Sequence, residues 1–351
     1  MSMKNILDRR SFLRISAVSN TLPGYYMNRI IYIVSVLGLS FSCNHTAEKK
    51  GNVLGKAEIP YLKGESRMVI DPMPCTDFDQ DRWYTNDHCF VCDHEGNLHW
   101  FGINNPYPPQ GKRLYRYHPY LGHLITDNPV GEWERLHFAI DESEGTEYLG
   151  APFVIWHEES RRWVMILETY LDSRRLEVCW SDDLVNWERT HKAILPDKLW
   201  ISTRDPHIIK GSDNQYWIHL VSAGVEGLEE SQVIRIKTTD FIHFGDPQII
   251  LGIQADGRET YIESPFLLEK KGLWYLFCTY AHRRYEETLV IVSDDPDHFD
   301  YEKNCLTTLF GHAAEVFSYE GKSYISSCGP EDEQFLNQHG VTLAELAWAS
   351  Q

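Results

Sequence analysis

The chain has 351 residues, of which 42% are apolar, so it can form one large domain or two small ones with a substantial core. Acidic residues outnumber Lys and Arg by 51 to 33, and the formal net charge at pH 7 is −18. Because nucleic acids bind through Lys and Arg contacts to phosphate, this composition argues against nucleic acid and strongly anionic polymers as partners.

Residues 1–42 have the pattern of a signal region. Met27-Asn-Arg29 is a short basic start, Ile30–Leu39 is an apolar run of ten, and small residues lead from there to Cys43. A run of ten is too short to span a bilayer and fits a signal peptide. Arg9–Arg14 resembles a twin-arginine signal, but the apolar stretch after it is weak, so we favour Met27 as the natural start.

The segment that ends at Cys43 resembles a bacterial lipobox. This resemblance implies a lipid-anchored protein of the periplasm or outer membrane, acylated at Cys43, with no other contact to the membrane. Residues 43–64 are polar and are predicted to form a tether, and residues 65–351 to form a single domain.

Seven cysteines remain after Cys43, and their spacing is not that of a small disulfide-rich domain. Cys89 and Cys92, with His94 and His99, raise the alternative of a zinc site. Residues three apart on a strand face opposite sides, however, and no second Cys pair is present. We therefore predict structural cysteines.

From residue 86 onwards the chain repeats an apolar strand, a polar turn and a second apolar strand. Five such units start near residues 87, 151, 205, 263 and 313. Pro152, Pro206 and Pro265 all fall at the start of a first strand, where a missing backbone N–H is tolerated. Several units add a third strand that ends in Ser or Thr, then Asp, then an aromatic residue, as in Leu176–Trp187 and Val233–Phe244.

Repetition of strands and turns at this interval predicts an all-β fold, a five-bladed β-propeller, with a β-sandwich as the alternative. The first strand of each propeller blade lines the central channel, so Asp87, Asp205 and Glu263 should converge on one pocket. Aligning the prolines places Glu263 opposite Arg204, one position before Asp205. Both carboxylates can face one pocket only if the strand start is twisted or bulged.

Asn86-Asp87, Arg204-Asp205-Pro206 and Glu263-Ser-Pro265 resemble the three acidic motifs of the five-bladed propeller glycoside hydrolases of families 43, 32 and 68. The resemblance covers residues 80–348. Arg-Asp-Pro is similar to family 32, which acts on fructosides, and Glu-x-Pro-Phe is similar to family 43, which acts on arabinosides and xylosides. His88 and Cys89 depart from the family 32 pattern of Pro-Asn-Gly after the first Asp.

The resemblance implies an oligo- or polysaccharide substrate and a catalytic role for each carboxylate. Glu263 would be the general acid, Asp87 the base or nucleophile, and Asp205 the group that stabilises positive charge on the sugar ring. The separation of the two carboxyl groups decides between retention and inversion, and the sequence does not supply it.

The other candidates bind substrate or ions. Trp83 and Trp200 could stack on a sugar ring, Arg204 could partner a carboxylate, and Arg283 could bind an anionic sugar substituent. His312 resembles the axial histidine of family 43; no cofactor is expected, although a channel calcium near His312 stays open. Glu315 has an apolar setting and no assigned role.

Two other functions remain open at this point. One is a glycan-binding propeller without catalysis, against which the retention of three carboxylates argues. The other is a phosphorylase, which would need a basic phosphate pocket, whereas Arg204, Arg258 and Arg283 are scattered along the chain.

Overall fold

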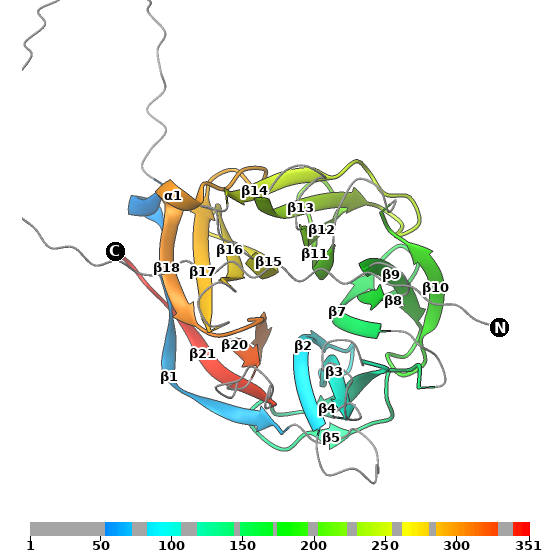
Figure 1. Cartoon of the computed structure of the whole chain (residues 1–351). Coiled ribbons are helices and arrows are strands. Elements are labelled where there is room, and N and C mark those ends of the chain that lie inside the picture. The colour runs from blue at the N-terminus through cyan, green and yellow to red at the C-terminus, as the bar shows by residue number, and fades with distance from the viewer. Residues whose placement is uncertain are drawn as a thin grey trace, which may run out of the picture. The chain divides into compact units, whose positions relative to one another are not determined.

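Five antiparallel sheets surround a common centre in the computed structural model of the chain, each forming one blade of a propeller (Figure 1). The structure describes residues 53–71, 83–106, 118–143, 148–170, 174–195, 203–222, 230–254, 262–280, 286–328 and 340–351. The prediction of a five-bladed β-propeller is confirmed. The signal region 1–42, Cys43, Trp200 and Arg283 lie outside the described residues.

The strands follow the chain order blade by blade. Blade one contains β2 (Trp83–Cys92), β3 (Leu98–Pro106), β4 (Tyr120–Thr126) and the short β5 (Glu134–Arg135) and β6 (Ile140–Asp141). Blade two contains β7 (Tyr148–His157), β8 (Arg162–Tyr170), β9 (Arg174–Ser181) and β10 (Glu188–Ala193). Blade three contains β11 (Arg204–Lys210), β12 (Tyr216–Ser222), β13 (Glu230–Thr238) and β14 (Gln248–Gln254). Blade four contains β15 (Ile262–Lys270), β16 (Leu273–Tyr280), β17 (Glu287–Ser293) and β18 (Cys305–Phe310).

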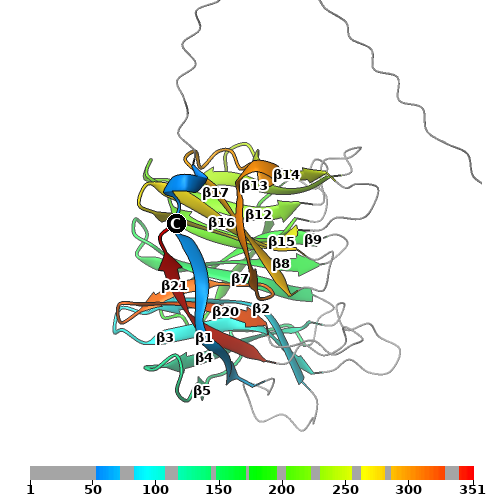
Figure 2. The same ribbon diagram turned by 90° about the vertical axis from the view of Figure 1, so that its left-hand side faces the viewer.

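Blade five joins the two ends of the described chain. It contains β19 (Val316–Tyr319), β20 (Lys322–Cys328), β21 (Val341–Ala349) and, as its outermost strand, β1 (Ile59–Ile70), which pairs with β21 (Figure 2). The ring is therefore closed by backbone hydrogen bonds between distant parts of the sequence. Strand β1 begins inside the segment 43–64 that was expected to be a tether, so the folded domain starts before residue 65.

Helices are short in this structure. A 3₁₀ turn (Leu54–Lys56) precedes β1, and α1 (Tyr301–Asn304) lies between β17 and β18. Among the residues that the structure describes, no helix is long and apolar enough to cross a membrane.

The Ser/Thr-Asp motif forms a hydrogen-bonded turn after the third strand of a blade. In blade two, the Asp183 carboxylate accepts hydrogen bonds from the backbone N–H groups of Val185 and Asn186. In blade three, Asp240 accepts in the same way from Ile242 and His243. Such turns satisfy backbone donors that the sheet leaves unpaired and direct the chain back into the outer strand.

Apolar side chains fill the space between neighbouring blades, but buried histidines lie among them. His207 of β11 packs between Phe153 and Phe266, with ring-centroid distances of 4.8 and 4.1 Å. His219 of β12 lies beside it, at a ring-centroid distance of 5.7 Å. Burial lowers the pKa of His207 to about 3 and that of His219 well below its usual value of 6.5.

These histidines predict a loss of stability in mild acid. They stay neutral in the folded protein, whereas in the unfolded chain they take up a proton near pH 6.5. Their contribution to stability is therefore complete above pH 6.5 and is lost as the pH falls, by up to about 1.4 kcal/mol per pH unit for each histidine. Urea unfolding of the parent should show a lower midpoint at about pH 5 than at about pH 7.5.

His207→Gln removes one of these groups and should reduce the difference between the two midpoints. The matched control is His243→Gln, because the side chain of His243 is 86% exposed. An equal pH dependence in the parent and in His207→Gln would contradict the assignment.

Candidate active site

The first strand of each of blades one to four carries a bulge near its start. In blades two, three and four one extra residue is inserted at Ala151-Pro152, Asp205-Pro206 and Ser264-Pro265. Ala151, Asp205 and Ser264 adopt the left-handed conformation there, with φ of 38°, 56° and 48°. Non-glycine residues rarely adopt this conformation, and each instance costs of the order of 1–3 kcal/mol. The bulge anticipated from the proline alignment is present.

The bulge brings carboxylates of blades three and four to one guanidinium. The Arg204 Nη2 atom lies 2.7 Å from Glu263 Oε1, and Arg204 Nε lies 3.5 Å from Asp205 Oδ2. The Ser264 backbone N–H donates to Asp205 Oδ2 at 3.0 Å. Since the Arg204 side chain is only 9% exposed and that of Glu263 18%, this charge group is largely shielded from water. The structure therefore unites three of the predicted residues.

Asp87 enters the same group from blade one. The extra residue of β2 falls at Asn86-Asp87, so Asp87 occupies the position of Pro206, one residue further along than Asp205. Burial raises the pKa of Asp87 well above its usual value. The negative charges of Asp205, Glu263 and Glu168 raise it further, and Arg204 opposes them. All three predicted carboxylates are thus close enough to influence one another.

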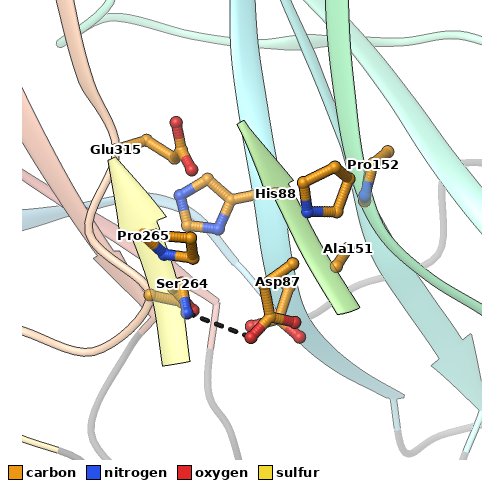
Figure 3. A pocket seen from close by; sticks show the side chains of 10 residues that line it. Asp87, His88, Ala151, Pro152, Ser264, Pro265 and Glu315 are labelled. Carbon is orange, nitrogen blue, oxygen red and sulfur yellow. Dashed lines mark hydrogen bonds between the residues drawn. The ribbon is translucent and has the colours of Figure 1, made fainter. Parts of the chain in front are cut away.

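A small cavity, of about 10 Å³, lies at the meeting point of the five blades. Its walls contain Asp87, His88, Ala151, Pro152, Asp205, Pro206, Ser264, Pro265, Ala313 and Glu315. In Figure 3 the side chains of Asp87 and His88 lie between Pro152 on one side and Pro265 on the other, and Glu315 lies above Pro265 in this view. Neither Glu263 nor Arg204 is in the wall itself, but Arg204 pairs with both Glu263 and the wall residue Asp205.

Strand β20 connects this wall with blade one. Nδ1 of His88 lies 3.0 Å from the Asn86 carbonyl oxygen, which can only accept, so the ring hydrogen sits on Nδ1. Burial lowers the pKa of His88 to about 4, so the ring is neutral and its Nε2 accepts from the Ser326 hydroxyl at 2.8 Å. Cys328 Sγ donates to Asn86 Oδ1 at 3.3 Å. These bonds hold the backbone on both sides of Asp87.

Trp83 and His312, two further predicted residues, lie in different surroundings. Trp83 is buried and its ring packs on Phe138 and Tyr120 at 6.1 and 6.2 Å, so it belongs to the packing of blade one and is not placed to stack on a sugar. His312 is buried next to the wall, and its backbone N–H donates to Ser327 Oγ. Burial lowers the pKa of His312 to about 4, and the charge of Asp205 opposes this.

Possible metal ligands are not grouped in the described part of the chain. Across the described ranges, no three His, Cys, Asp or Glu side chains are grouped so as to hold a metal ion. A calcium ion near His312 therefore remains an expectation. Cys89 and Cys92 are free thiols, one buried and the other exposed, and His99 pairs instead with His123 and Asp93.

Two further carboxyl groups belong to this site: sequence reasoning missed Glu168 and gave Glu315 no role. Glu168, at the end of the second strand of blade two, acts electrostatically on Asp87 and Arg204. Glu315 lies in the cavity wall, and burial together with the charges of Asp87 and Asp205 raises its pKa well above the usual value. For Glu168 the available signal was a single acidic residue near the end of an apolar strand, and for Glu315 it was a single acidic residue just before a strand. Neither signal by itself indicates where the side chain points.

Neither a protein-family model nor a curated protein sequence matches this chain. Solved structures do. A family 43 β-xylosidase/α-arabinofuranosidase from a compost microbial metagenome matches with a TM-score of 0.59 and 14% identity, over 81% of this chain and 96% of that one. An endo-arabinase from Bacteroides thetaiotaomicron matches with a TM-score of 0.58 and 15% identity, over 80% of this chain and 97% of that one.

A family 32 β-fructofuranosidase from Bombyx mori matches with a TM-score of 0.58 and 18% identity, over 80% of this chain and 62% of that one. At these identities the comparisons establish the fold. The resemblance to the five-bladed propeller hydrolases of families 43 and 32 is therefore confirmed at the level of architecture.

The shared guanidinium predicts a large, pH-dependent loss of stability in Arg204→Met. Removing the positive charge leaves Asp205 and Glu263 shielded from water and uncompensated, which costs roughly 3–5 kcal/mol. The loss should be greatest near neutral pH and smaller in acid, where the carboxylates take up protons. Urea unfolding of Arg204→Met and the parent, at about pH 7.5 and at about pH 5, measures this loss of stability.

Arg189→Met is the matched control, because the Arg189 side chain is 8% exposed and pairs with Glu177 and Glu142 away from the cavity. Both variants should be destabilised, but only Arg204→Met should change the titration of Asp87. If Arg204→Met is as stable as the parent, the shared ion pair does not hold the site together.

Proposed function

We propose that this chain is a glycoside hydrolase that cleaves a furanoside or pentoside of the arabinofuranoside, fructoside or xyloside type. The observation that carries the proposal is the meeting of Asp87, Asp205 and Glu263, from three blades, around Arg204 at the centre of the ring. Glycoside hydrolysis needs two carboxyl groups with different roles. A non-catalytic binding protein has no need of several shielded carboxylates whose burial costs stability.

In the proposed mechanism Glu263 protonates the leaving oxygen. Arg204, 2.7 Å from Glu263 Oε1, stabilises the carboxylate that forms once Glu263 has given its proton to the leaving oxygen. Asp87 acts from another blade as the base that activates water or as the nucleophile. Because its pKa is raised, Asp87 is a stronger base than an exposed aspartate, once the pH is high enough to ionise it.

Asp205 has a fixed carboxylate in this scheme. The Ser264 N–H and Arg204 both hold its Oδ2 atom. A carboxylate held in this way can stabilise the positive charge that develops on the sugar ring in the transition state, without reorganising during the reaction.

Glu263→Gln tests the acid role. The amide keeps the shape of the side chain but cannot donate the proton as a carboxylic acid does, so kcat should fall by roughly 10²–10⁴. The substrates are neutral arabino-, fructo-, xylo- and galactosides, with the product anomer followed by NMR.

The control is Glu269→Gln, an exposed glutamate on the same strand β15, which should hydrolyse at the parent rate. Equal rates for Glu263→Gln and the parent would remove Glu263 as the acid. Binding of these sugars by the parent without any hydrolysis would support a glycan-binding propeller instead.

We also propose that Cys43 carries a lipid anchor that holds the protein at the periplasmic or outer-membrane surface. The support is the lipobox-like sequence and the start of β1 at Ile59, which leaves only a short connection between the anchor and the ring. In bacteria fed a labelled fatty acid, the parent and Cys92→Ala should carry the label and Cys43→Ala should not. Label retained in Cys43→Ala would contradict the anchor.

A further inference from the structure

Glu168 is a buried carboxyl group behind the first strand of blade two. It lies on β8, is 1% exposed, and pairs in register with Gly150 of β7, the last paired residue before the bulge. The second-strand residues that face the corresponding positions are Asn104 in blade one, Val221 in blade three and Thr279 in blade four. Blade two is thus the one among these four blades that places an ionisable group there.

The position of Gly150 explains how this carboxyl group reaches the site. In blades three and four the equivalent first-strand residues are Arg204 and Glu263, the two partners of the central ion pair. At Gly150 a Cβ atom would lie 3.3 Å from Glu168 Oε2 and 3.0 Å from the Tyr148 ring. The absence of a side chain on the first strand leaves room for a carboxylate that approaches from the second strand.

The charge of Glu168 acts on two members of the site. It attracts Arg204, as Glu263 and Asp205 do, and it opposes ionisation of Asp87. Strand β11, which carries Arg204, packs against β8. A shielded carboxylate needs a positive partner, and the guanidinium has donors beyond those directed to Glu263 and Asp205.

We propose that Glu168 is a positioning residue of the site, whose buried carboxylate acts on Arg204 and Asp87 from behind Gly150. This inference rests on the proposed function for its catalytic consequence, but not for its electrostatic one. With Glu168 charged, Asp87 holds its proton more tightly and takes a proton from water more readily once ionised. The first strand of blade two carries no carboxylate, so blade two acts on the site through Glu168 on its second strand.

Glu168→Gln keeps the size of the side chain and removes its charge. The acidic limb of the kcat/KM profile should move to lower pH by about one unit, because one negative charge near Asp87 is lost. The plateau of kcat should fall by about 3–10-fold, because Asp87 becomes a weaker base, while KM stays within about twofold. Glu168→Asp, which keeps the charge, should leave the acidic limb close to that of the parent.

A readout that does not depend on activity separates this inference from the proposed function. The Asp87 carboxyl can be titrated by ¹³C NMR in protein with labelled aspartate, and identified by the signal that disappears in Asp87→Asn. Its midpoint should be lower in Glu168→Gln than in the parent. If the midpoint moves and the parent hydrolyses no glycoside, the positioning role holds and the proposed function fails.

Glu177→Gln is the matched control. Glu177 lies on β9 of the same blade, its side chain is 4% exposed, and it pairs with Arg189 away from the cavity. This variant should be less stable but should titrate like the parent at Asp87. An unchanged Asp87 midpoint in Glu168→Gln, or an equal shift in Glu177→Gln, would overturn the inference.

Discussion

The site depends on one shielded guanidinium. Asp205 and Glu263 come from different blades, and without a positive charge between them their repulsion and loss of hydration would favour protonation or separation. Arg204 contacts both, and its own burial is acceptable because these carboxylates surround it. The same contacts therefore join blades three and four and set the charge that any ligand in the cavity meets.

This arrangement requires the bulges in the first strands of the blades. A regular strand would point Glu263 and the residue after it to opposite faces, whereas the inserted residue lets carboxylates at either position reach the centre. The repetition of a left-handed residue at Ala151, Asp205 and Ser264 indicates that the distortion belongs to the blade and not to one catalytic residue. Prolines that follow these residues tolerate the break because they have no ladder hydrogen bond to lose.

Local repetition made the ring and its three carboxylates predictable, because each blade repeats its strand-turn-strand pattern within about 50–60 residues. Features that depend on distant pairing were not predictable. Strand β1 has the composition of a polar segment and becomes a strand by pairing with β21, at the other end of the chain. Glu168 reaches the site only because a neighbouring strand has glycine at position 150, and Trp83 is equally suited to packing or stacking until its neighbours are known.

The charge balance of the centre limits the chemistry that fits it. Asp87, Glu168, Asp205, Glu263 and Glu315 gather there with Arg204, and the nearby His88 and His312 are neutral at physiological pH because burial lowers their pKa to about 4. Such a centre repels an anionic group and stabilises a reacting atom that becomes positive. A phosphorylase would have to bring anionic phosphate into this field, whereas hydrolysis needs only neutral water. The oxocarbenium-like transition state of glycoside cleavage has the charge that the field favours in either case. The electrostatics therefore favour the proposed hydrolysis of a neutral glycoside over its phosphorolysis, independently of the likeness in fold.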